Sequence, residues 1–117
     1  MAKVMETISG AIGKVYDLKE LDNGSAVMRI SVATTPRYMK DNQWVDGETI
    51  WTNVTLWNSL ARSFARSNLQ PGTPVIITGT RKARLNQSYT NRNGVEVPEH
   101  VEQEVVADSV AVELMPF

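Results

Sequence analysis

A single helical pattern in an otherwise strand-forming chain narrows the possible folds more than any other feature. It follows directly after Trp57, and Asn58 or Ser59 is expected to cap it. The segment from Asn68 to Gly72 is expected to end it, with Pro71-Gly72 as the turn. The apolar residues that recur at helical spacing are Leu60, Ala61, Phe64 and Ala65.

Two segments before this helix alternate with the period of two that strands show. In residues 26–33, the face expected in the core carries Ala26, Met28, Ile30 and Val32. In residues 50–57, the face expected in the core carries Ile50, Thr52, Val54 and Leu56. The other face of that second segment carries Trp51, Asn53, Thr55 and Trp57. Two tryptophans on a polar face favour a partly wet surface that binds a ligand.

The remaining segments predict three more strands with turns between them. Residues 4–15 form a weaker strand, in which Gly10 and Gly13 allow a bend or bulge. A turn at 22–25 follows, and the polar stretch 40–47 is expected to be a loop that holds Trp44. After the helix, the expected segments are a strand over 73–81 extended to 89, a turn over 91–94 with positive φ favoured at Asn93-Gly94, and a returning strand over 95–112 interrupted near Pro98.

The predicted order is therefore strand, strand, strand, helix, strand, strand. This is the layout of the five-stranded OB-fold, a Greek-key barrel that is all-β with one helix. A length of 117 residues suits one domain over residues 1–117, with residues 113–117 as a short C-terminal tip. OB barrels commonly bind oligonucleotides across their second and third strands.

Charge is unevenly distributed behind a net value of −1. Residues 25–92 hold nine basic and three acidic side chains, whereas residues 93–117 hold six acidic and no basic ones. The middle of the chain suits a polyanionic partner. Basic side chains spread over a solvated surface explain the same counts equally well.

Several function classes lack the residues they need. The chain has no cysteine and one histidine, His100, and it contains no phosphate-binding loop or metal-ligand spacing. No catalytic constellation is visible, so we expect a protein that is not an enzyme and needs no cofactor or metal. No apolar run has the length of a membrane span, and the N-terminus lacks the apolar core of a signal peptide, so a cytoplasmic location is expected.

Three segments together resemble bacterial single-stranded DNA-binding proteins: residues 25–33, 46–57 and 69–79. Residues 32–37 and 44–46 are similar to actinobacterial or phage members. The resemblance implies sequence-independent binding and protection of single-stranded DNA during replication, recombination and repair, near the nucleoid. It also implies a homotetramer. The first strand, with Val4 and Ile8 on a mostly uncharged segment, suits edge-to-edge pairing with a second copy of the chain.

Site residues follow from the resemblance and from the basic middle segment. The stacking aromatics are expected at Tyr38, Trp51, Trp57 and Tyr89. The DNA-backbone partners are expected at Arg29, Arg37, Lys40, Arg81, Lys82, Arg84 and Arg92. Arg62 and Arg66 are weaker candidates on the helix, and Trp44 is a weaker stacker. Asn86 stands where the family often has another aromatic, so that stacking position is displaced to Tyr89 or lost.

Two alternatives stay open at this stage. The chain ends in Pro116-Phe117, which is either an incidental end or a short tip that docks replication and repair proteins. The whole chain is either a DNA-binding protein or an OB-fold primosomal adaptor that acts mainly through protein contacts. A nuclease is remote because carboxylates do not cluster.

Overall fold

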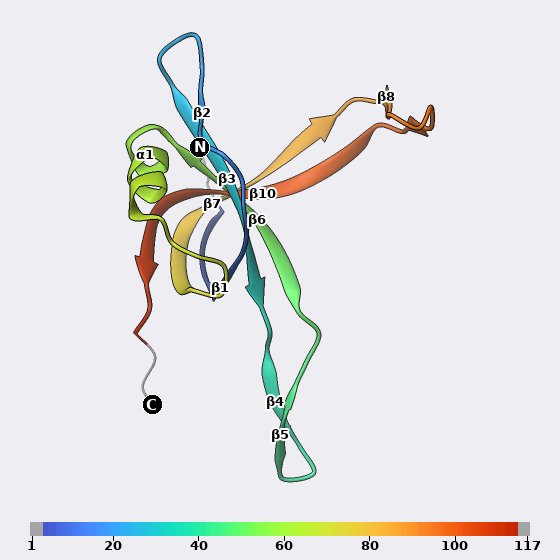
Figure 1. The fold of residues 1–117 in the computed structure, drawn as a ribbon. Coiled ribbons are helices and arrows are strands. Elements are labelled where there is room, and N and C mark those ends of the chain that lie inside the picture. The colour runs from blue at the N-terminus through green and yellow to red at the C-terminus, as the bar shows by residue number, and fades with distance from the viewer. Residues whose placement is uncertain (1–3, 115–117) are drawn as a thin grey trace.

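Five long strands close into a barrel in the computed structural model (Figure 1). The structure describes residues 4–114, apart from the side chains of residues 84–86 and His100. They are β1 (Met5–Val15), β3 (Ala26–Thr34), β6 (Ile50–Trp57), β7 (Pro74–Asn86) and β10 (His100–Val112). Their order is β1-β7-β10-β6-β3, and β3 pairs back with β1. The closed barrel, with one helix between its third and fourth strands, confirms the predicted OB-fold.

The core is almost wholly aliphatic. Among the described residues it is built on Ile12, Ile30, Val32, Val54, Leu56, Val75, Ile77 and Val105, with Phe64 as its one aromatic ring. The predicted inner face of β3 is confirmed, because Ala26, Met28, Ile30 and Val32 are all buried. Burying these side chains supplies the main driving force for folding, and it uses no tryptophan or tyrosine.

The predicted faces of β6 are wrong at two positions. Ile50 is 57% exposed, whereas Thr55 is only 2% exposed and its hydroxyl donates to Glu104 Oε2 at 2.6 Å. The cause is β10, which pairs with β6 in parallel only at Val54 and Thr55. It therefore covers the C-terminal half of β6 and not its start. The start of β6 instead runs with β3 beyond the barrel, so Ile50 has no core to enter.

Besides the hairpin over residues 19–27, two longer hairpin arms leave the barrel (Figure 1). One continues from β3 and β6 and ends in β4 (Arg37–Lys40) and β5 (Gln43–Asp46). The loop predicted over 40–47 is therefore wrong, because Asp41 and Asn42 take φ values of 52° and 62° and form a tight two-residue hairpin turn. The other arm is the outer half of β7 and β10, with β8 (Tyr89–Thr90) and β9 (Glu96–Val97) beyond it.

Both predicted Asn-Gly turns form with the same geometry. Gly24 and Gly94 take positive φ, and their N–H groups donate to the carbonyls of Leu21 and Asn91. Asn93 does not share the positive φ expected of it, because its N–H is held by the side chain of Asn91. The first turn carries β2 (Lys19–Glu20), which pairs with the start of β3.

The helix α1 (Asn58–Ser67) packs on β3 and β6 through Ala61 and Phe64. The predicted side-chain cap is wrong: Trp57 is the N-cap residue, and no side chain caps the helix. Asn58 Oδ1 instead accepts a bond from the N–H of Ala26 at 3.1 Å, which satisfies a backbone donor at the buried start of β3. No helix in residues 4–114 is long and apolar enough to span a membrane.

Candidate nucleic-acid interface

The pairing of β3 with β6 builds one outer face of the barrel, which we call the barrel face. Its register sets Val27 opposite Trp57, Arg29 opposite Thr55, Ser31 opposite Asn53, and Ala33 opposite Trp51. Alternate residues of a strand share a face, so these residues lie on one side of the two strands. The two tryptophans and Arg29 are exposed there, so the structure brings these predicted site residues together.

Trp51 rests directly on the backbone of β1. A Cβ atom added at Gly13 would collide with Cζ3 of the Trp51 ring and would lie 2.9 Å from Ser31 Oγ. Gly13 therefore leaves the space that the ring occupies, and Ser31 Oγ accepts a bond from the Lys14 N–H at 2.8 Å beside it. The expected bulge is confirmed here, since the β1–β3 register shifts between Ile12 and Val15. The outer edge of the ring thus contacts β1 at Gly13, while Trp51 stays 63% exposed.

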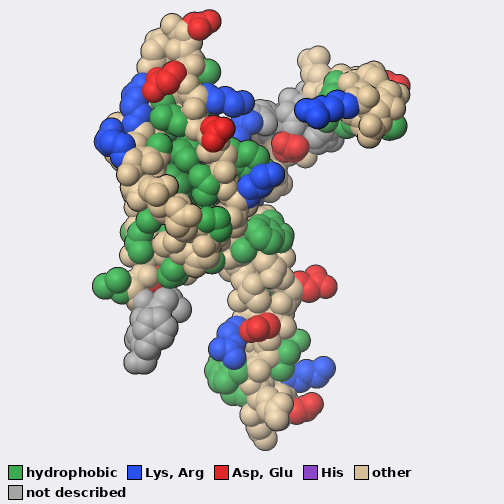
Figure 2. Space-filling view, in the orientation of Figure 1, with side chains coloured by type: hydrophobic (Ala, Val, Ile, Leu, Met, Phe, Trp, Pro, Cys, Tyr) green, Lys and Arg blue, Asp and Glu red, His purple; other side chains and the backbone are tan. Residues whose placement is uncertain are grey.

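An open groove of ≈ 860 Å³ runs along this face. Trp57 and Arg29 line it, as expected from the sequence, and Glu102, Gln103 and Glu104 form its wall on β10. Figure 2 shows hydrophobic side chains gathered on the barrel with basic side chains around them. Aromatic rings, amides and cations in one open groove suit a ligand that carries both bases and phosphates.

The predicted cations differ in whether they already form ion pairs or hydrogen bonds within the chain. Among the described residues, no carboxylate lies within ion-pair distance of Arg29, Lys40, Lys82 or Arg92. Arg37 Nε lies 3.2 Å from Asp46 Oδ1, and its guanidinium lies 5.9 Å from the centre of the Trp44 ring. The side chain of Arg84 lies outside the description. On the helix, Arg62 donates to the Gly24 carbonyl at 2.9 Å, and Arg66 donates to Ser63.

Among the predicted cations whose side chains are described, Arg81 is the one held most firmly within the chain. Its Nε and Nη2 donate to the two carboxylate oxygens of Glu6 at 2.6 and 2.7 Å, and its Nη1 donates to Gln103 at 3.0 Å. The hydrogen bonds from Arg81 lower the pKa of Glu6, and those to Glu6 raise the pKa of Arg81. Such a two-pronged pair is directional and largely neutralised, which leaves Arg81 less charge for a phosphate.

The other predicted rings lie on the arms and not on the barrel face. Tyr38 is exposed on β4 opposite Val45, and Trp44 is exposed on β5 opposite Met39. Tyr89 is exposed on β8 at the end of the second arm. Figure 1 shows these two arm ends pointing away from each other. The positions of Pro116 and Phe117 and the side chain of Asn86 fall outside the described part of the chain.

Sequence analysis overlooked Tyr16. This ring is exposed, lines the groove with Trp57, and has the ammonium of Lys14 4.9 Å from its centre. The bulge after Ile12 shifts the β1–β3 register before Lys14 and Tyr16, so alternation along the strand gave no signal for this ring. Among the side chains that the structure describes, no group of three or more is placed to hold a metal ion.

A closed barrel with exposed rings and cations on its outer face defines an OB-fold of the nucleic-acid-binding kind. The chain belongs to the single-strand binding protein family, whose model matches residues 3–113. It is 38% identical over 96 residues to single-stranded DNA-binding protein 2 of Streptomyces coelicolor, covering 78% of this chain and 46% of that protein. It is 36% identical over 90 residues to the single-stranded DNA-binding protein of Paenarthrobacter aurescens, covering 75% of this chain and 50% of that one.

A solved structure agrees with these sequence matches. The crystal structure of the small single-stranded DNA-binding protein from Streptomyces coelicolor superposes with a TM-score of 0.76 at 26% identity, covering 97% of both chains. The chain spans about half the length of the curated relatives it matches. The family and the fold expected from the sequence are thus confirmed, including the likeness to actinobacterial members.

Proposed function

We propose that this protein binds single-stranded DNA without regard to sequence. One observation carries the proposal: all three tryptophans and all three tyrosines are exposed, by 42% to 63% of each side chain. Aromatic side chains gain much from burial, and here aliphatic residues fill the core instead. Rings left in water on a barrel face and two arms are best explained by a ligand that stacks on them. The printed names of the relatives describe the same ligand.

The mechanism follows from the chemistry of single strands. Unpaired bases stack on Tyr38, Trp51, Trp57 and Tyr89, at about 1–3 kcal/mol per base and without reading sequence. Lys and Arg side chains neutralise phosphates and release counterions. The cations proposed for this role are Arg29, Arg37, Lys40, Lys82, Arg84 and Arg92. Arg81 contributes less than these because Glu6 already binds its guanidinium.

The biological role proposed is protection of single strands during replication, recombination and repair, which places the protein at the nucleoid. The proposed assembly is a homotetramer. It is supported by β1, which pairs with β7 over Met5–Ala11 but with β3 only from Ala11 onward. The opposite edge of β1 before Ala11 therefore offers backbone groups to a second copy, apart from the Ser9 carbonyl, which accepts a bond from Thr34 Oγ1. Docking of replication and repair proteins at Pro116-Phe117 belongs to the same proposal.

Intrinsic tryptophan fluorescence titrated with oligo-dT tests the proposal. Stacking on Trp51 and Trp57 should quench the emission strongly, with a stoichiometric end point at low salt and weaker binding at high salt. An unchanged emission without detectable binding would contradict DNA binding and would favour the adaptor that acts through protein contacts. Shortening of the oligonucleotide in the presence of Mg²⁺ would instead indicate a nuclease.

A further inference from the structure

We propose that Tyr16 is a further base-stacking ring of this interface, held beside Arg29 and backed by Lys14. The proposal deepens the DNA-binding function proposed above and depends on it. Neither the charge pattern nor the resemblance pointed to this residue. It follows from the way β1 leaves the barrel beside β3.

The backbone fixes where the Tyr16 ring lies. The N–H of Tyr16 donates to the carbonyl of Arg29 at 3.0 Å, which continues the β1–β3 pairing one residue beyond the end of β1. Tyr16 therefore adjoins β3 on one side, while Trp57 on β6 adjoins β3 on the other side. Two strand spacings separate the backbones that carry the two rings, roughly 9–10 Å. Both rings line the same groove.

One face of the Tyr16 ring is covered by a cation, and the side chain remains exposed to solvent. Lys14 Nζ lies 4.9 Å from the ring centre, so a cation occupies one face of the phenol. The Tyr16 side chain is still 48% exposed. A base stacked on the free face would leave Lys14 on the opposite face of the ring, where its ammonium adds positive charge to the site.

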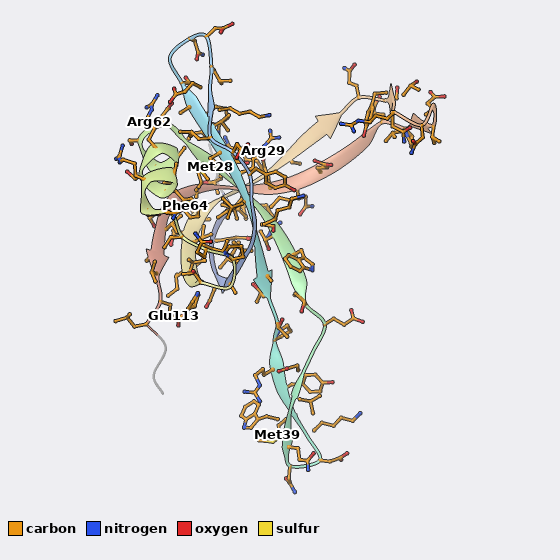
Figure 3. The ribbon with its side chains drawn as sticks, viewed as in Figure 1. Met28, Arg29, Met39, Arg62, Phe64 and Glu113 are labelled. Carbon is orange, nitrogen blue, oxygen red and sulfur yellow. The ribbon has the colours of Figure 1, made fainter. Side chains whose placement is uncertain are left out.

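The charges of the groove favour the side on which Tyr16 lies. The β10 wall presents the carboxylate of Glu104, which the hydroxyl of Thr55 holds in place. The wall beside Tyr16 presents Lys19 and Arg29 together with one acid, Asp17. A polyanion is repelled by the first wall and attracted by the second. Figure 3 shows Arg29 on the barrel, well away from Met39 on the β4–β5 arm, so this site is distinct from the arm contacts.

Two variants of the full chain test the role of the ring. Tyr16→Leu removes the aromatic face and keeps the apolar bulk, whereas Tyr16→Phe keeps the ring and serves as the matched control. The expected result is about tenfold weaker binding of oligo-dT for Tyr16→Leu, within the range of one lost stacked base. Tyr16→Phe should bind within about twofold of the wild type, because stacking uses the ring and not the hydroxyl. Melting temperatures of both variants exclude a folding defect.

A cross-linking experiment on the wild-type protein makes the result independent of any variant. Oligo-dT carrying 5-iodouracil should form a photo-cross-link that peptide mass spectrometry locates at Tyr16. Absence of this cross-link, together with wild-type affinity for Tyr16→Leu, would overturn the inference. Trp51→Leu measured in parallel separates the two proposals: if it binds more weakly while Tyr16→Leu does not, DNA binding stands and only the role of Tyr16 fails.

Discussion

The barrel face and the two arms expose the same kinds of side chain on very different supports. Trp51 rests on the backbone of β1 at Gly13, and the strands beneath it enclose the core. Tyr38 and Trp44 stand on a two-stranded hairpin, β4–β5, whose strands pair only with each other. A ribbon of two strands is marginally stable in water by itself.

The two kinds of support determine how binding energy is divided between the barrel face and the arms. Rings on the barrel face are already positioned, so stacking there loses little to conformational entropy. Rings on a two-stranded arm are held less firmly, so we expect the entropy lost on binding to offset part of each stacking contact there. We therefore expect the barrel face to supply affinity and the arms to extend the length of DNA covered. Variants in each region test this division.

Trp51→Ala should weaken binding to oligo-dT by about 1–3 kcal/mol, because it removes a supported stacking ring. The melting temperature should fall only slightly, since most of this side chain is exposed. Fluorescence anisotropy of a labelled oligonucleotide and thermal denaturation measure the two quantities. A large fall in melting temperature with unchanged affinity would show that Trp51 serves the fold instead.

Gly13→Ala should weaken binding by about 1 kcal/mol, which is less than the effect of Trp51→Ala. The reason is that the new methyl group displaces the Trp51 ring from its position against β1. The matched control is Gly24→Ala. Gly24 has a φ of +87° and no heavy atom within 4 Å of an added Cβ, so that change strains the β2–β3 turn without touching the barrel face. It should lower the free energy of unfolding by about 1 kcal/mol or more and leave affinity unchanged. Equal losses of affinity in both variants would contradict the proposal that Gly13 positions the Trp51 ring.

Tyr38→Ala should affect long oligonucleotides more than short ones. An oligo-dT of roughly eight nucleotides fits the site of one OB-fold, and we expect it to be held mainly by the barrel face. A longer strand reaches the β4–β5 arm and should lose roughly 0.5–1 kcal/mol, because arm ordering offsets part of the stacking energy. Isothermal titration with both lengths measures the difference. An equal loss for the two lengths would remove the distinction between barrel face and arms.

Glu6→Gln should have the smallest effect and should strengthen binding. It frees the Arg81 guanidinium from its carboxylate partner, so the salt slope should steepen by at most about 0.7. The pairing lowers the pKa of Glu6, so its contribution to stability is present above the ordinary pKa of a glutamate and is lost as pH falls through the lowered value. The variant should lack this pH-dependent part of the melting temperature. Unchanged salt and pH profiles would mean that the pair has no such role.

Local patterns in the sequence predicted the barrel well. One helix placed between strands of period two, with an apolar face on β3, led directly to the OB-fold. The incorrect predictions concern residues whose burial depends on segments that are distant in the sequence. Thr55 is buried because β10 pairs beside it, and Ile50 is exposed because β6 has left the barrel at that point. Neither outcome is encoded in the alternation of residues 50–57.

The site was predictable to a similar degree. Alternation on β6 placed Trp51 and Trp57 on one face, and their register against β3 added Arg29. Tyr16 was missed because the bulge after Ile12 breaks the alternation of β1 just before it. The salt bridge between Arg81 and Glu6 joins residues 75 positions apart, so charge counting along the chain credited Arg81 with a free charge that it does not have.

Stacking of bases on the rings of the barrel face is tested most directly with a protein that has Trp51 as its only tryptophan. Trp44→Phe and Trp57→Phe together give that protein while keeping a ring at each site. Strong quenching of Trp51 emission is expected, and it should saturate at the same oligo-dT ratio as binding measured by anisotropy. Full binding by anisotropy with unchanged Trp51 emission would contradict stacking on this ring.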